Sequence, residues 1–389
     1  MIRITRTTLA GCSLALVLTA GCSAQDRDAQ PTTPGTTPGT TPALADRLTV
    51  PAGFTVRYFA QGLSGVRFLA LGPDGAVYAS VPGANKVMRL TDVDGDGVAD
   101  SSVVAVSGLN RPQGLAFHKG YLYIANTDGV VRVRLGATGR ASGAPEAVNH
   151  YSGGGTHWTR SIVFGADSAM YVAVGSSCNL CVEKDSTRAA VMRYDEDGRN
   201  GRVFARGLRN AVGIALNPAT GQIWVSQNER DNIAPDHQNL PPEEINILRG
   251  GGDYGWPYCY SLHGAAVPNP EYHDGARCSG TIPAALEMQA HSAPLGITFL
   301  HDATSFPEEY RGDLLVAFHG SWNRDEPTGA KVVRVHIVNG QPVSVEDFVT
   351  GWQLANGERW GRPVDAIVYR DGSVLISDDA GGAIYRVSH

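Results

Sequence analysis

The sequence is poor in charge and contains no basic cluster. Only 18% of its 389 residues are charged, the formal net charge is −6, and no run of Lys and Arg exceeds two residues. Proteins that bind nucleic acid depend on clustered cations, so this class of function is nearly excluded. Long hydrophobic runs are also lacking, because the apolar stretch 9–20 is too short to span a bilayer as a stable anchor.

The cysteines lack the spacings of common metal and haem sites. Cys178 and Cys181 form a CxxC pair, but no second CxxC follows and no His stands at ligand spacing, which argues against zinc. The pair is not CxxCH, so covalently attached haem is not indicated. The remaining cysteines of the mature body are Cys259 and Cys278, and an even number suits an oxidising compartment. We therefore predict two local disulfides, Cys178–Cys181 and Cys259–Cys278.

The N-terminus has the pattern of an export signal. Arg3 and Arg6 precede the apolar stretch, which ends in LTAGC at 18–22 and resembles a bacterial lipobox. We predict a lipoprotein signal peptide over 1–21, lipidation of Cys22 and an exported, membrane-anchored protein on the periplasmic face. LAGC at 9–12 fits the lipobox more closely, but no apolar core precedes it. Plain secretion, with Cys22 removed or left as a free thiol, is the alternative.

A spacer follows the signal. Residues 22–45 include PTTPGTTPGTTP, a composition that cannot bury apolar surface and favours an extended or flexible chain. We therefore expect a tether over 22–45 and a single folded domain over 46–389.

One pattern recurs six times in this domain. Each copy has a Gly-rich lead-in, an apolar strand, a turn, and two further strands, with apolar and polar residues alternating at period two. Such short sheets cannot bury both faces alone and stack radially, so we predict an all-β fold, a six-bladed β-propeller of four-stranded antiparallel blades. Residues 44–60 are expected to supply the outer strand of the last blade, and a two-domain β-sandwich is the alternative fold. The six lead-ins begin at Gly62, Gly108, Gly155, Gly207, Ser292 and Gly361.

Polar side chains stand where five of the six copies enter their first strand, a position that faces one end of the central channel of a propeller. Several arginines that converge beside one histidine favour an anionic ligand held by bidentate contacts. The alternative is that each Arg pairs with an acidic residue at a strand end. The polar residues are Arg67, Gln113, His157, Arg160, Arg209, Asn210 and Arg362.

Longer motifs carry a family resemblance. The order and spacing of GLRN and the later GGDYGWP are its most specific part. Over about residues 50–389 the sequence resembles the soluble pyrroloquinoline quinone (PQQ)-dependent aldose and sorbosone dehydrogenases, and it is most similar to the sorbosone branch. The motifs are GTHWTRSIVFG, VGSSCNLC, GLRNAVGIALNP, SQNERD, EEINILRGGGDYGWPYCY, FHGSWNR and WGRPVDA.

The resemblance implies PQQ at the channel mouth. His157 stands where the family has its general base, which takes the proton of the sugar C1 hydroxyl as hydride passes to the PQQ C5. Arg209, which we also count as catalytic, and Asn210 match a pair at the quinone oxygens, where charge develops. Arg362 matches an arginine that binds a PQQ carboxylate, whereas a second family arginine aligns with Val364.

The same resemblance implies further cofactor contacts. Lys331 or Arg324 is expected to replace the missing arginine, and Trp322 to stack on the planar cofactor. The remaining candidates for cofactor binding are Arg67, Gln113, Arg160 and Asn228.

The resemblance also implies calcium. Family members hold the ion partly through two consecutive carbonyls at Gly-Pro, and the matching segment here is SQNERD at 226–231. The backbone carbonyls of Glu229 and Arg230 are therefore the predicted ligands. A possible second ion site is the insert 92–100, where Asp92, Asp94 and Asp96 alternate, and a solvated acidic turn is an equal alternative.

The main hypothesis is a PQQ- and calcium-dependent dehydrogenase. Its substrate is an aldose oxidised at C1 or an aldosulose such as sorbosone oxidised at the aldehyde, and its electrons pass to an external acceptor. A calcium-dependent, lactonase-type hydrolase is less consistent with the arginines, which would repel a bare cation. A ligand-binding propeller without catalysis would predict loss of His157 or of the Arg209–Asn210 pair, and all three residues are present.

Overall fold

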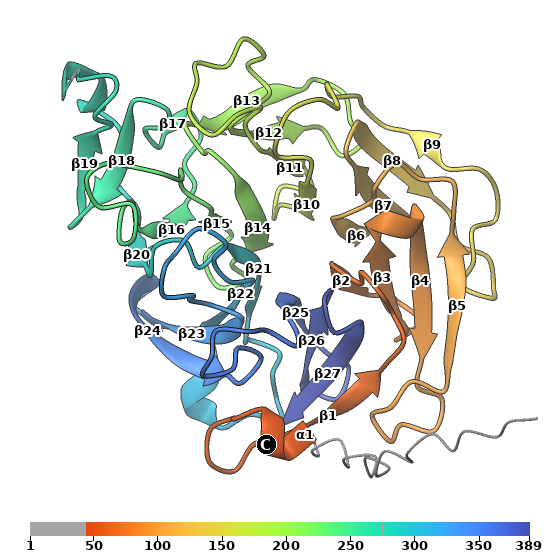
Figure 1. Ribbon diagram of the computed structural model, residues 1–389. Helices are drawn as coiled ribbons and strands as arrows, with labels where there is room; N and C mark the ends of the chain where they lie inside the picture. Colours follow the sequence, from red (N-terminus) through yellow and green to blue (C-terminus); the bar gives the residue numbers. More distant parts are fainter. Residues whose placement is uncertain (1–43, 274) are drawn as a thin grey trace, which may run out of the picture. The chain divides into compact units, whose positions relative to one another are not determined.

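The computed structural model describes residues 44–273 and 275–389 (Figure 1). The predicted signal peptide 1–21, the lipidation site Cys22 and nearly all of the predicted tether 22–45 lie outside the described residues. The first described element is the short helix α1 (Leu44–Arg47). None of the helices in the described part combines the length and the apolar character needed to cross a bilayer.

Six antiparallel sheets surround a central axis in the described domain, and one edge strand of each sheet is innermost (Figure 1). Neighbouring innermost strands contact one another in the order β2, β6, β10, β14, β21, β25 and back to β2. The predicted six-bladed β-propeller is therefore confirmed, and the two-domain sandwich is excluded.

The strands of blades one to three are β2 (Leu69–Leu71), β3 (Val77–Val81), β4 (Lys86–Thr91), β5 (Ser101–Val106); β6 (Leu115–His118), β7 (Tyr121–Asn126), β8 (Gly129–Val133), β9 (Glu146–Ala147); and β10 (Arg160–Phe164), β11 (Met170–Val174), β12 (Ala190–Tyr194), β13 (Arg202–Arg206). Those of blades four to six are β14 (Ala211–Leu216), β15 (Ile223–Gln227), β16 (Glu243–Ile247), β20 (Leu286–Met288); β21 (Pro294–Phe299), β22 (Leu314–Phe318), β23 (Lys331–Val338), β24 (Gln341–Val349); and β25 (Pro363–Val368), β26 (Val374–Asp378), β27 (Ala383–Ser388), β1 (Thr55–Ala60). The 3₁₀ turns are η1 (Pro82–Ala84), η2 (Gly275–Cys278) and η3 (Glu308–Tyr310).

The two ends of the domain meet in the sixth blade. Strand β1 pairs antiparallel with β27, with Thr55 opposite Ser388, so the segment before the first repeat closes the ring as expected. Two additions depart from the simple repeat. Strand β17 (Gly252–Asp253) adds to β13 in parallel, and the hairpin of β18 (Cys259–Leu262) and β19 (Ala265–Pro268) stands outside the blades. The Cys259–Cys278 disulfide joins this hairpin to η2.

The core lies between the blades. Strands β3, β11, β15, β22 and β26 are buried along their whole length because a neighbouring blade covers each of their faces. The outermost strand β24 is mostly exposed, since one face meets water. One apolar cluster fills each of the six junctions between adjacent blades. Packing between blades therefore holds the innermost strands in a fixed ring.

A further apolar cluster crosses the central channel. It consists of Phe68, Val212, Leu295 and Val364, which come from four blades. Val364, the position that matches the second arginine of the resembled family, is fully buried there. In the described domain, a charged side chain at this position would lie among apolar groups.

Candidate functional site

A cavity of about 490 Å³ lies where the chain enters β10, β14, β21 and β25. This volume falls in the range of roughly 300–1,000 Å³ that is common to small-molecule sites. Loops that follow β11, β15 and β22 complete the walls. The lining residues are Thr156, His157, Asn179, Arg209, Asn210, Asn228, Glu229, Asp231, Asn232, Glu243, His291, Ala293, His319, Gly320, Trp322, Asn323 and Arg362.

His157 presents an unprotonated nitrogen to this cavity. Its Nδ1 lies 3.0 Å from the Ser176 carbonyl oxygen and 2.9 Å from Ser176 Oγ. Ser176 Oγ donates its own proton to the Cys178 carbonyl at 2.6 Å, so both partners of Nδ1 accept. These partners assign the proton to Nδ1 and leave the lone pair on Nε2. Burial, followed by the charge of Arg209, lowers the pKa of His157 to about 3, which keeps the imidazole neutral at neutral pH.

Arg209 is buried, and all five of its side-chain N–H groups are occupied. Nε donates to the Asn179 carbonyl at 3.0 Å, and Nη2 donates to Asn179 Oδ1 at 2.8 Å and to Asp231 Oδ2 at 3.2 Å. Nη1 donates to the carbonyls of Asn228 at 3.1 Å and Glu229 at 2.7 Å. A guanidinium has five N–H donors, so Arg209 acts here as a clamp on the loop after β15.

Other groups of the lining keep unused hydrogen-bonding capacity. Arg362 donates from Nε to the His319 carbonyl and from Nη2 to the Gly320 carbonyl, both at 2.8 Å, which leaves three N–H donors. Asn210 Oδ1 is buried without a hydrogen-bond partner among the described residues. The indole of Trp322 is 74% exposed. These three side chains can therefore contact a ligand without breaking an internal bond.

A second histidine faces the same cavity. His319 Nε2 donates to Asp379 Oδ1 at 2.9 Å, and Arg67 Nη1 donates to the other oxygen of that carboxylate at 2.5 Å. Arg67 Nε also donates to Gln113 Oε1 at 3.0 Å. Burial lowers the pKa of His319 to about 4. The predicted ligand contacts Arg67 and Gln113 thus belong to a network that holds His319 in place, and neither residue lines the cavity.

Buried carboxyl groups lie beneath the loop after β15. Glu243 accepts hydrogen bonds from the backbone N–H groups of Glu229 and Ala293. Gln227 Nε2 donates to both Glu229 and Glu244. Burial raises the pKa of Glu243 to about 8, and burial with the nearby charge of Glu229 does the same for Glu244. At neutral pH these two side chains are therefore largely neutral hydrogen-bonding groups.

One of the two predicted calcium ligands, the Glu229 carbonyl, is already engaged by a cation. The carbonyl oxygen of Glu229 lies 2.7 Å from the Arg209 guanidinium, and a second cation at the same oxygen would be repelled. The side chain of Arg230 is buried and pairs with Glu271 Oε2 at 2.5 Å. Calcium at Glu229 and Arg230 accordingly stays a prediction.

Several other predicted contacts lie away from the cavity. Arg160 is fully buried and donates to the backbone carbonyls of His157, Thr159 and Ser152. Lys331 pairs with Asp347 at 2.6 Å, because β24 lies beside β23. Arg324 donates to the backbone carbonyls of Glu326 and Gln238. Each of these cations already has acceptors, and none of the three lines the cavity.

The acidic insert 92–100 gathers a different set of carboxylates than expected. Asp92, Asp94 and Asp100 bring oxygens within 4.8 Å of one another. Asp96 instead accepts a hydrogen bond from the Val98 N–H at 2.8 Å. Asp92 is buried and accepts from the backbone N–H groups of Gly95 and Gly97, so the loop is held by its own hydrogen bonds.

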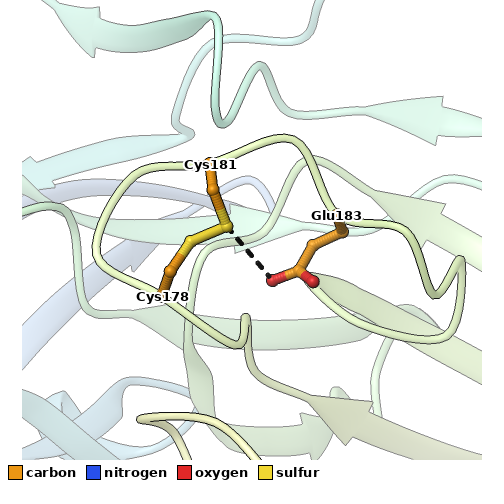
Figure 2. A group of neighbouring side chains, drawn as sticks. All are labelled: Cys178, Cys181 and Glu183. Atoms are coloured by element: carbon orange, nitrogen blue, oxygen red, sulfur yellow. Dashed lines mark hydrogen bonds between the residues drawn. A yellow bond between two sulfur atoms is a disulfide. The ribbon is translucent and has the colours of Figure 1, made fainter.

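The CxxC pair is a disulfide, as predicted. Cys178 and Cys181 are bonded to each other with Glu183 beside them, and Cys181 Sγ lies 4.0 Å from Glu183 Oε1 (Figure 2). A metal site would need free thiolates, so the disulfide is consistent with the absence of a zinc motif.

The structure unites His157, Arg209, Asn210, Asn228, Glu229, Trp322 and Arg362 at one cavity, and it adds residues that were not singled out from the sequence. The most informative additions are Asn179, Asp231 and His319. Each stands inside a motif that carried the resemblance, VGSSCNLC, SQNERD or FHGSWNR, and these motifs were the signal from which they could have been found.

Fold and site together define a six-bladed β-propeller with a polar small-molecule site at the mouth of its channel. The chain belongs to the TrAA12-like family, whose model matches residues 48–389.

Several known proteins match large parts of this chain in sequence or structure. An uncharacterized protein of Borreliella burgdorferi is 33% identical over 225 residues, and the match covers 57% of each chain. The pyrroloquinoline quinone-dependent sugar dehydrogenase of Hypocrea jecorina is 25% identical, and the match covers 78% of this chain and 80% of the relative. The holo form of the pyranose dehydrogenase PQQ domain from Coprinopsis cinerea has the same fold, with a TM-score of 0.74, 23% identity, and coverage of 88% of this chain and 97% of that domain.

Proposed function

We propose that this protein is a PQQ-dependent sugar dehydrogenase. The observation that carries the proposal is His157, whose neutral imidazole presents a free Nε2 lone pair inside a cavity of small-molecule size. Membership of the TrAA12-like family and the named activity of the Hypocrea jecorina relative support the oxidation of a sugar.

The unused groups of the cavity fit PQQ, a planar molecule with three carboxylates and an ortho-quinone. Arg362 has three free N–H donors for a carboxylate, and Trp322 offers an exposed aromatic face for stacking. A quinone oxygen is an acceptor, so Asn210 would contact it through the N–H groups of Nδ2 and not through the unpartnered Oδ1. When bound, PQQ supplies the acceptor for the hydride that leaves the sugar.

The protein supplies the proton acceptor. His157 Nε2 takes the proton of the C1 hydroxyl, and the hydrogen bond from Nδ1–H to Ser176 offsets part of the burial and of the Arg209 charge that disfavour the imidazolium. Because both hydrogen bonds to Ser176 fix the plane of the ring, the lone pair keeps one direction. His319, which Asp379 holds in the same way, adds a second fixed imidazole to the wall of the cavity.

The cavity also suits a substrate rich in hydroxyl groups. Asn323 Nδ2 donates to Asp231 Oδ1 at 2.8 Å, while Asn323 Oδ1 is buried and has no partner among the described residues. A sugar hydroxyl would satisfy that oxygen. We propose an aldose oxidised at C1 as the substrate, or an aldosulose such as sorbosone oxidised at its aldehyde, which would react as the hydrate so that a hydroxyl is present to give its proton to His157.

We further propose that the protein acts after export, as a lipoprotein anchored through Cys22 on the periplasmic face of a membrane. The sequence has no haem motif, so the electrons pass from the bound cofactor to an external acceptor. Calcium is a separate requirement that the test below examines with EDTA, because Arg209 already donates to the Glu229 carbonyl.

Reconstitution tests the proposal. The purified protein is incubated with PQQ, with calcium or with EDTA, and dye reduction is followed with aldoses and sorbosone. We expect turnover that requires PQQ and is lost in His157→Gln. If PQQ binds but no sugar reduces the dye, the substrate class is wrong. If PQQ does not bind, the cavity serves another ligand and the proposal fails.

A further inference from the structure

The disulfide loop next to the cavity is anchored on both sides. Only Asn179 and Leu180 lie between Cys178 and Cys181, so the disulfide closes a very short loop. Glu183 accepts hydrogen bonds from both the backbone N–H and the Oγ of Ser177, immediately before the loop. Figure 2 shows Glu183 directed at the joined cysteines. The position of Asn179 is therefore constrained by a covalent bond and by a carboxylate.

Asn179 makes a twofold contact with Arg209. Its carbonyl oxygen accepts from Arg209 Nε at 3.0 Å, and its Oδ1 accepts from Arg209 Nη2 at 2.8 Å. Two parallel hydrogen bonds to one edge of a guanidinium fix both the position and the plane of the group. The carbonyl also accepts from Trp256 Nε1 at 3.3 Å, so the loop is held from the opposite side as well.

The same amide holds the loop that contains Asp231. Asn179 Oδ1 accepts from the Asp231 N–H at 2.9 Å, and Asn179 Nδ2 donates to the Asp231 carbonyl at 3.1 Å. The side chain thus pairs with the backbone of the loop after β15 in the way a neighbouring strand would. Asp231 in turn contacts Arg209 and Asn323, which both line the cavity.

The loop also reaches the proton acceptor. Ser176 Oγ, which accepts from His157 Nδ1, donates to the carbonyl of Cys178 at 2.6 Å. This bond fixes the direction of the Ser176 hydroxyl and with it the tautomer of His157. One short disulfide loop therefore supports both His157 and Arg209, although the two residues belong to different blades.

We propose that Asn179, held by the Cys178–Cys181 disulfide, is a positioning residue that fixes Arg209 and the loop of Asp231 for the reaction. The expected effect on turnover rests on the proposed function. The positioning of Arg209 and of the Asp231 loop does not, because it can be tested in the protein without cofactor. The disulfide is then part of the active-site support, whereas Cys259–Cys278 serves the outer hairpin.

The first test measures the reactivity of Arg209 without cofactor. Phenylglyoxal modifies accessible arginines, and Arg209 is only 4% exposed. We expect Asn179→Ala to raise the modification rate of Arg209 about tenfold. This factor corresponds to the loss of roughly 1.4 kcal/mol of hydrogen bonding. Peptide mass spectrometry measures the modification of each arginine. Cys178→Ser/Cys181→Ser should act in the same direction. Cys259→Ser/Cys278→Ser is the matched control, and Arg206, with a side chain 68% exposed, is the internal reference.

The second test uses the PQQ-loaded protein. We expect Asn179→Ala to lower kcat about 10- to 100-fold with a smaller change in KM, because Arg209 and His157 lose their fixed positions while the other lining groups remain. The control disulfide variant should lower the melting temperature but leave kcat unchanged.

The outcomes separate the two proposals. An unchanged Arg209 modification rate in Asn179→Ala would overturn the positioning role. The same conclusion follows if both disulfide variants alter kcat and Arg209 reactivity equally. If Asn179→Ala fails to fold, the Cys178→Ser/Cys181→Ser variant decides in its place. Absence of PQQ binding to the wild-type protein would defeat the proposed function but leave the modification test valid.

Discussion

Lowering the pH should leave His157 neutral far below the usual titration range of histidine. Its pKa is about 3, because burial and the charge of Arg209 disfavour the imidazolium. At pH 5 a histidine of ordinary pKa 6.5 is about 97% protonated, whereas His157 would be only about 1% protonated. The cofactor-free protein should therefore keep a proton acceptor in its cavity at mildly acidic pH.

The lowered pKa of His157 also makes the free energy of unfolding depend on pH. The unfolded chain binds a proton at this residue below pH 6.5 and the folded protein does not, so stability is lost as pH falls from 6.5 towards 3. The contribution of His157 to this loss is about 2 kcal/mol at pH 5. His157→Gln should reduce the decline in unfolding free energy between pH 7 and pH 5 by that amount.

NMR titration of histidine-labelled protein measures the pKa directly, with His157→Gln used to assign the signal. The ¹⁵N shifts should also show the proton on Nδ1, as the two acceptors on Ser176 require. A midpoint near 6.5, or a proton on Nε2, would refute the reasoning.

Three further predictions concern the stability of the fold. Val364→Arg should lower the unfolding free energy by more than about 3 kcal/mol in urea, because it places an unpaired charge in the apolar cluster across the channel. A loss within 1 kcal/mol would show that the channel can accept a second arginine. Glu244→Gln should flatten the dependence of stability on pH between 4.5 and 8, since the protonated Glu244, with a pKa of about 8, stabilises the fold below this window and loses that effect as pH rises. Unfolding at pH 5 and pH 8 checks this, and an unchanged slope would contradict it. Removing the Cys259–Cys278 disulfide, which spans a sequence separation of 19, should cost about 3 kcal/mol in thermal or urea unfolding. No measurable loss would mean that the hairpin contributes little to the domain.

Periodicity was enough to predict the architecture. The alternation at period two and the repeated lead-ins predicted six blades, and the segment before the first repeat was correctly assigned to the last blade because a ring needs a closing strand. Strand β17 and the outer hairpin were not predicted, because they belong to an insertion that repeats nowhere else. Both disulfides were predicted from the even number of cysteines together with the expectation that the protein is exported.

The site was only partly predictable. His157 and Arg362 could be found because both lie within a few residues of the start of an innermost strand, β10 or β25, where the repeat fixes the position. His319 and Asn179 lie in loops after the second strands, whose paths depend on tertiary contacts. Arg160 had the expected place in the sequence, yet its guanidinium binds backbone carbonyls instead of facing the cavity. Such a choice depends on which acceptors lie near the side chain, and sequence spacing does not contain that information.

The central claim is that the cavity around His157 oxidises a sugar with bound PQQ. A single turnover without oxygen or dye tests it most directly. PQQ-loaded protein is mixed anaerobically with each sugar of a panel, and the quinone absorbance is recorded over time. We predict that at least one aldose or aldosulose bleaches the quinone, and that His157→Gln slows this step about 100-fold or more, as expected for loss of a general base. Bound PQQ that no sugar reduces, or bleaching at the same rate in His157→Gln, would contradict the account.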